Sequence, residues 1–115
     1  MLNIDNRQNI TLTRGDTAYI DVTGLKNRDG TAYEFEDGDK VYFRLKGEQI
    51  LIEKEADIDL VENTATLTIY PDDTEDLAFT SYRYEMELVT ANDEHFTFIA
   101  DKNFVIGVEL EVHDG

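Results

Sequence analysis

The sequence offers few residues that could carry out nucleophilic or acid–base catalysis. Ser81 is its single serine, His95 and His113 are its only histidines, and it has no cysteine. A serine nucleophile needs a histidine within hydrogen-bond reach, and the sequence also lacks a G-x-S-x-G turn. Because neither histidine has a second histidine at ligand spacing, we predict no catalytic zinc site. We therefore expect a protein that is not an enzyme, with no catalytic, metal-ligating or cofactor-binding residues and no cofactor.

Carboxylates are the one abundant group of reactive side chains, with 26 aspartates and glutamates. A pair of carboxylates could hydrolyse a glycosidic bond, and a cluster of them could bind calcium. Acidic residues gather at 34–39 and 72–76, but neither segment has the alternating ligands, central glycine and distal glutamate of an EF-hand loop. We interpret both segments as solvated acidic surface, with a calcium-binding loop as the alternative.

The net charge narrows the range of partners. The 26 acidic residues outweigh 10 basic ones, which gives a formal net charge of −16. Such a field repels phosphate backbones and anionic lipids, so we expect neither nucleic acid nor a membrane as a partner. The N-terminus has no signal-peptide pattern, and no apolar run approaches the ~20 residues of a membrane helix. These features and the absence of cysteine predict a soluble protein made in a reducing cytosol.

The elements that would carry these residues are β-strands. Apolar and polar residues alternate almost throughout, which is the period of half-buried strands. The dense charges at 57–62 suit a strand at a sheet edge. We expect a long polar connection at 24–39, and a tight hairpin turn, not an integrin-binding motif, at Arg14-Gly15-Asp16. We predict about eight short strands from the alternating segments at 10–13, 18–23, 40–46, 49–54, 57–62, 65–69, 82–88, 95–99 and 104–112.

One segment indicates how these strands fold together. Pro71 ends a strand, and residues 72–77 are typical of a helical turn capped by Asp72 or Asp73. The strand that follows begins with a Tyr-x-Tyr pattern at Tyr82 and Tyr84. This order is typical of the corner between strands E and F of an immunoglobulin-like domain, where a tyrosine hydroxyl bonds back to the backbone.

The predicted fold class is all-β. We expect an immunoglobulin-like antiparallel β-sandwich of about eight strands, with one short helical turn before the Tyr-x-Tyr strand. A small β-barrel is the alternative. Residues 1–115 fit a single domain, with its core at about 8–112.

Three tyrosines are candidate interface residues. Tyr19, Tyr33 and Tyr42 fall outside the phase of the inferred core. Exposed tyrosines can anchor a protein interface or stack on a sugar ring. The alternative is that they are partly buried beneath the long connection at 24–39.

Four segments together resemble one protein family. They read ITLTRGDT at 10–17, DGTAYEFEDGDKVYFRLK at 29–46, ATLTIYPDDTEDLAFTSYRYEMELV at 65–89 and NFVIG at 103–107. In order and spacing they are similar to the N-terminal immunoglobulin-like domain of baseplate upper proteins of tailed phages, and to related small phage structural proteins. The sequence differs from that family at two places where the family often has glycine. Just before the Tyr-x-Tyr strand it has Phe79-Thr80-Ser81, and before the last phenylalanine it has Asn103.

The resemblance implies a biological setting. It implies a structural role in a phage or prophage tail or baseplate, with self-association or docking to other phage structural proteins. It also implies a protein that is made in the bacterial cytoplasm and carried in the virion. The family offers no catalytic residues to transfer to this sequence.

Three functions are open from the sequence. The first is a non-catalytic structural or assembly module of a phage tail or baseplate, acting by protein–protein contacts. The second is a stand-alone immunoglobulin-like module that binds carbohydrate or a host surface, which the tyrosines suggest. The third is an acidic mimic of nucleic acid that blocks a DNA-binding protein, which the charge of −16 suggests.

Overall fold

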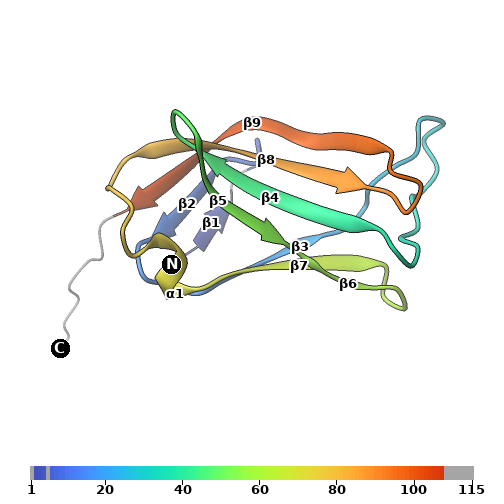
Figure 1. Ribbon diagram of the computed structural model, residues 1–115, viewed down its shortest axis with the longest axis horizontal. Helices are drawn as coiled ribbons and strands as arrows, with labels where there is room; N and C mark the ends of the chain where they lie inside the picture. The colour runs from blue at the N-terminus through green and yellow to red at the C-terminus, as the bar shows by residue number, and fades with distance from the viewer. Residues whose placement is uncertain (1, 5, 108–115) are drawn as a thin grey trace.

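Two β-sheets packed face to face form the protein, as the computed structural model in Figure 1 shows. The structure describes residues 2–4 and 6–107. One sheet has six strands in the order β1-β2-β9-β8-β4-β5, and the other has three in the order β3-β7-β6. The elements are β1 (Leu2–Ile4), β2 (Ile10–Thr13), β3 (Ala18–Val22), β4 (Lys40–Lys46), β5 (Ile50–Glu55), β6 (Asp57–Asp59), β7 (Thr64–Ile69), α1 (Pro71–Thr74), β8 (Ser81–Val89) and β9 (His95–Gly107).

The strand order confirms the predicted all-β sandwich. With β3, β7 and β6 taken as strands B, E and D, and β4, β8 and β9 as C, F and G, the order is that of an immunoglobulin-like sandwich. One pairing departs from the antiparallel prediction, because β2 runs parallel to β9, with Ile10 beside Phe104 and Leu12 beside Ile106. The remaining strand pairs are antiparallel.

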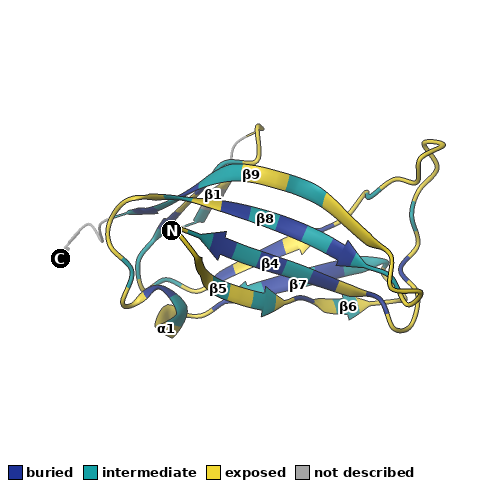
Figure 2. Ribbon diagram, turned by 45° about the horizontal axis from the view of Figure 1, so that its top comes forward, coloured by how far each residue is buried: buried dark blue, intermediate teal, exposed yellow. Residues whose placement is uncertain are grey.

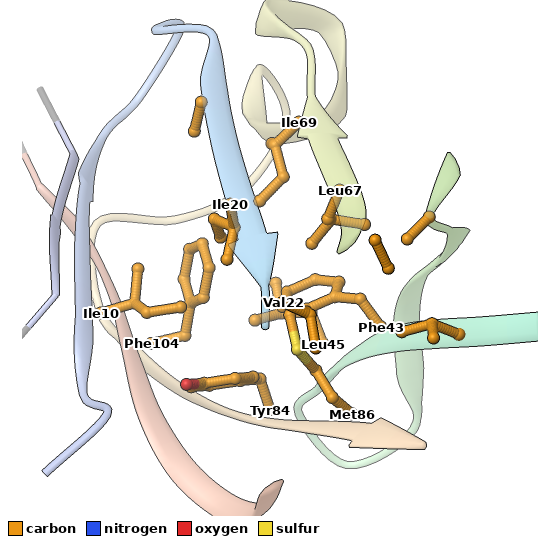
Figure 3. Packing of buried hydrophobic residues seen from close by; sticks show 14 of the residues in the cluster. Ile10, Ile20, Val22, Phe43, Leu45, Leu67, Ile69, Tyr84, Met86 and Phe104 are labelled. Carbon is orange, nitrogen blue, oxygen red and sulfur yellow. The ribbon is translucent and has the colours of Figure 1, made fainter. Parts of the chain in front are cut away.

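Strict alternation along the strands builds the core between the two sheets. In β7 the inward residues Ala65, Leu67 and Ile69 are buried, while the intervening threonines are half-buried. β4 and β8 alternate in the same way, as the colours of Figure 2 show. At the centre the rings of Phe43, Tyr84 and Phe104 pack with centroids 5.6 to 6.0 Å apart (Figure 3). The alternation is therefore sufficient to assign most core positions from the sequence.

The helical corner forms where it was predicted, but its cap differs. α1 is a single turn, and its N-cap residue is Tyr70, not Asp72 or Asp73. Asp73 lies at the third helical position, where its carboxylate accepts a hydrogen bond of 2.7 Å from the Tyr70 backbone N–H. Because Pro71 has no N–H to donate, it suits the first position of the turn, and this moves the helix start one residue earlier.

Both tyrosines of the Tyr-x-Tyr strand bond to backbone. The hydroxyl of Tyr82 donates to the carbonyl oxygen of Ala78 at 3.2 Å, four residues upstream, which is the bond of a tyrosine corner. The hydroxyl of the buried Tyr84 donates to the carbonyl oxygen of Gln8. Tyr84 therefore ties the chain before β2 to the centre of the core.

The Arg14-Gly15-Asp16 segment turns the chain as predicted, but it is not a hairpin. β2 and β3 lie in different sheets, because β2 pairs with β9 and the turn carries the chain across to the other layer. Gly15 adopts a φ of +87°, and its N–H donates to Thr74 Oγ1 at 3.0 Å. The guanidinium of Arg14 lies 4.0 Å from the ring centroid of Phe79. The tripeptide is thus packed against the helical corner.

The two segments predicted as the last strands, 95–99 and 104–112, belong to one long strand as far as the structure describes them. β9 continues through an irregularity near Asp101, whose φ is +57°. Val108, Leu110, Val112 and His113 lie outside the described residues. β1 was not predicted, because three residues are too few to show an alternation. No helix among the described residues is long and apolar enough to cross a membrane.

Candidate functional site

One side of the sandwich leaves two strand edges without a partner strand. β2 pairs with β9 only at Phe104–Gly107, so the first part of β9 has β8 on one side and no strand among the described residues on the other. β3 is also an edge strand, since β7 is its sole partner within the part of the chain that is described. We call the opening that runs along the first part of β9, beside β3 and the connection at 24–39, the seam.

The seam is lined mainly by apolar side chains. It consists of two hollows, of about 780 and 300 Å³, which share Leu25 and Phe98. The larger hollow lies between the connection at 24–39 and the β8–β9 turn, which stand at the same end of the molecule in Figure 1. The side chain of Phe96 in the larger hollow is 51% exposed, and that of Ile4 in the smaller one is 43% exposed. The apolar residues along the seam are Ile4, Ile10, Ile20, Val22, Leu25, Tyr33, Tyr84, Met86, Leu88, Phe96, Phe98 and Ile99.

Local interactions before β2 determine where the seam ends. Gln8 adopts a φ of +68°, and its carbonyl oxygen accepts the Tyr84 hydroxyl. The side-chain oxygen of Asn9 accepts a hydrogen bond from the Asn103 backbone N–H at 3.1 Å. These bonds hold the chain in a turn until Ile10, where pairing with β9 begins. Pairing along β9 is therefore limited to its final residues.

The other end of the seam is held in place by a network around Asp39. Asp39 is buried, and its Oδ2 accepts hydrogen bonds from the Tyr33 hydroxyl at 2.6 Å and from the Glu36 N–H at 2.9 Å. Its Oδ1 accepts from the Ala91 N–H at 3.0 Å, which joins the connection at 24–39 to the β8–β9 turn. Burial and the hydrogen bond to Asp39 raise the pKa of Tyr33, so its hydroxyl stays protonated and keeps donating. The larger hollow is thus preformed.

The three candidate interface tyrosines lie on three separate surfaces. Tyr19 is 67% exposed on the outer face of β3, beside Thr68. Tyr42 is half-buried on the outer face of β4, with the Arg44 guanidinium 5.4 Å from its ring centroid. Of the three, Tyr33 alone lines the seam. The structure therefore does not bring the three tyrosines together.

The sequence did not indicate that Phe96 and Phe98 line an accessible opening. Their alternation with Thr97 marks them as inward-facing, and they do point into the space between the sheets. The missing information was that, among the described residues, no strand pairs with this part of β9 on the side away from β8. That depends on the turn at Gln8, a residue that seldom adopts a positive φ.

The outer face of the six-stranded sheet carries a charge cluster centred on Arg44. Its guanidinium donates to Glu53 at 2.6 Å, Glu85 at 3.1 Å and Glu87 at 3.0 Å, and Lys46 donates to Glu85 at 2.6 Å. Hydrogen bonds from Lys46 and Arg44 hold the pKa of Glu85 below its usual value. Burial works to raise the pKa of Glu87, but hydrogen bonds from Arg44 and His95 outweigh it and lower that pKa. The two cations on β4 thus pair with three glutamates on the neighbouring strands β5 and β8.

His95 belongs to the same cluster and lies far from Ser81. Its Nδ1 lies 3.0 Å from Glu87 and its Nε2 lies 3.2 Å from Asp93, and these hydrogen bonds raise its pKa. Ser81 lies at the opposite end of β8 from His95, because His95 pairs with Val89. At about 3.3 Å per residue, the length of β8 separates Ser81 and His95 by roughly 26 Å.

One carboxylate in each acidic segment makes hydrogen bonds that stabilise the fold. Asp39 anchors its connection as described above, and Asp73 accepts hydrogen bonds from Lys54 at 2.6 Å and from the Tyr70 N–H. Across residues 2–4 and 6–107, no group of three or more His, Asp or Glu side chains is arranged to hold a metal ion.

Comparison with known proteins finds no matching family, no matching curated protein and no matching solved structure. Function is therefore inferred from the residues and geometry of this chain.

Proposed function

We propose that the protein is a non-catalytic assembly module that joins other proteins by contacts at the seam. The observation that carries this proposal is a preformed opening in which Phe96 is half exposed between the connection at 24–39 and the first part of β9, which no described strand covers on this side. Aromatic side chains such as Phe96 are enriched at protein interfaces relative to the rest of the surface. A partner that covers the seam would remove apolar surface from water, which is the main driving force for association.

The chemistry of the remaining polar groups supports the non-catalytic part of the proposal. Ser81 and His95 are too far apart to form a nucleophile–base pair. A glycosidase needs one carboxylic acid with a raised pKa, whereas the pKa values of Glu85 and Glu87 are both below the usual value of a glutamate. Both carboxylates therefore stay ionised at neutral pH and act as partners of Arg44.

The proposed setting is a phage or prophage tail or baseplate, with other structural proteins of the particle as partners. This part of the proposal rests on the resemblance of the four segments described above, and the virion is the location that we propose. Mass spectrometry of purified particles from the encoding strain is expected to detect the chain in stoichiometric amounts. Its consistent absence from particles would remove the phage setting but would leave the assembly role open.

Affinity purification from the encoding cells tests the assembly role itself. We expect the tagged protein to retain a defined partner, and Phe96→Ser to lose it. Val61→Ser is the matched control, because Val61 is 90% exposed in the turn between β6 and β7 and lines neither hollow of the seam. Equal recovery of the partner with both variants would contradict a role for the seam.

A further inference from the structure

We propose that the partner binds by strand addition: one extended segment of a different, basic protein pairs with the free edge of β9 along His95–Ile99. The segment would insert alternate apolar side chains into the seam. This proposal rests on the proposed function and specifies the binding mode and the chemistry of the partner.

The dimensions of β9 leave room for such a strand. β9 has 13 residues, and β2 pairs with four of them. Before the irregularity near Asp101, the segment His95–Ile99 is about 17 Å long at about 3.3 Å per residue. An added strand would lie in line with β2 and extend the six-stranded sheet beside β9. Main-chain hydrogen bonds to an unpaired edge supply affinity in this binding mode, and pockets for alternate side chains supply specificity.

The edge of β9 lacks the charges that the edge strands β5 and β6 carry. The edge strand β6 contains Asp57 and Asp59, and β5 contains Glu53, Lys54 and Glu55. Such charges discourage pairing with another chain. The sequence His-Phe-Thr-Phe-Ile at 95–99 contains no Asp, Glu, Lys, Arg or Pro. Among these edges, β9 is therefore the one suited to accept a strand.

The spacing of the seam matches the side chains of a strand. Every second residue of an added strand would face the sandwich interior, because side chains alternate between faces. Those residues would meet the two hollows that Phe98 and Leu25 share. Met86 and Val22, which both point into the interior in Figure 3, would form part of the floor. The inserted side chains are thus expected to be apolar.

The net charge of this protein indicates which side chains an added strand would carry on its outward face. The protein has a net charge of −16, and Glu36 and Glu94 line the larger hollow beside Lys26 and Arg28. A partner with Lys or Arg at its outward positions is attracted by this field, whereas a second copy of the chain is repelled. Residues 108–112, Val-Glu-Leu-Glu-Val, have a suitable alternation but an acidic charge. The charge therefore favours a different, basic protein over a second copy.

A displayed library of random nonapeptides, selected against the full chain, tests this inference. The enriched peptides are expected to alternate apolar residues with Lys or Arg. Binding of such a peptide should fall by about tenfold or more with Phe96→Ser, as for an aromatic residue central to an interface, and should be unchanged with Val61→Ser. Amide hydrogen exchange at His95–Ile99 should slow when the peptide is bound.

Other outcomes of the selection would overturn the inference. Enrichment of peptides without a two-residue alternation, protection of β3 in place of β9, or no enrichment at all would each exclude strand addition at β9. Enrichment of acidic peptides similar to residues 108–112 would indicate a second copy as the occupant. If affinity purification still shows loss of a partner with Phe96→Ser, the assembly role stands and only the binding mode fails.

Discussion

The hydroxyl of Tyr84 illustrates how one atom shapes the seam. It is buried in the core and donates to the carbonyl oxygen of Gln8, which holds the turn before β2. Tyr84→Phe would leave that carbonyl without this donor, so we expect the free energy of unfolding to fall by about 1–3 kcal/mol. Tyr82→Phe removes a bond at an exposed position and is expected to cost about 0.5–1.5 kcal/mol.

Urea unfolding of the two variants measures this difference. The slope of the unfolding free energy against urea should be unchanged, so that the midpoints report stability. A larger loss for Tyr82→Phe than for Tyr84→Phe would contradict the role given to the bond between Tyr84 and Gln8.

His95 gives the protein a pH dependence with a definite sign. Hydrogen bonds to Glu87 and Asp93 raise the pKa of His95 above its ordinary value near 6.5. The stabilisation from protonated His95 is therefore complete below that ordinary pKa and is lost as the pH rises through the raised pKa of the folded protein. Titration of the His95 ring protons by NMR should show the raised pKa directly.

Two variants separate the causes of this shift. Glu87→Gln is expected to lower the pKa of His95 the most, because Glu87 makes the strongest contribution, and Asp93→Asn should lower it less. In His95→Gln the difference in stability from the parent protein should shrink as the pH rises. A His95 pKa at or below 6.5 in the parent would refute this assignment.

At the scale of elements, the charge cluster on the large sheet links β4, β5 and β8. The Arg44 side chain is 18% exposed and contacts three glutamates, whereas Lys46 is 40% exposed and contacts one. Arg44→Met would leave Glu87 without its main cation. We therefore expect the free energy of unfolding to fall by about 1.5–3 kcal/mol at neutral pH. Lys46→Met should cost about 0–1 kcal/mol, as for an exposed ion pair.

Chemical denaturation at neutral and at acidic pH checks this prediction. Protonation of the glutamates removes their unpaired charge, so the penalty of Arg44→Met should decrease at acidic pH. Equal penalties for the two variants, or a penalty that does not change with pH, would show that the cluster does not stabilise the sheet in this way.

The sequence determines the strands better than it determines their partners. The alternation at Val41, Phe43 and Leu45 predicts β4, and the short turn at Gly47 predicts its hairpin with β5. The parallel pairing of β2 with β9 joins Ile10 to Phe104 and has no local signal, so the turn at Gly15 was expected to close a hairpin. The helical corner was predictable because Pro71 and the tyrosines are close in the sequence.

The candidate site was much less predictable. The phase of Phe96 and Phe98 indicates that they face inward, but their exposure depends on how short β2 is. Of the tyrosines expected at an interface, Tyr33 is part of the seam, while Tyr19 and Tyr42 lie on other faces. A tyrosine outside the alternation of the core is predicted to lie on the surface. Which other surface residues lie beside it depends on the three-dimensional fold and cannot be read from the alternation.

At the scale of the whole molecule, an apolar seam lies in a strongly acidic protein. A net charge of −16 disfavours association between copies, and the seam offers apolar surface for the contact proposed above. This combination suits a module that remains separate until it meets a partner of opposite charge. A matched pair of surface positions, Phe96 in the seam and Val61 outside it, allows a direct test.

Site-specific photo-crosslinking in the encoding cells is that test. A photoreactive phenylalanine analogue is placed at Phe96 in one full-length variant and at Val61 in another, and both are irradiated in growing cells. The protein is expected to form a discrete adduct with one other protein from position 96 and none from position 61. Absence of an adduct at position 96, or the same adducts from both positions, would contradict the proposal that the seam is where this protein joins its partner.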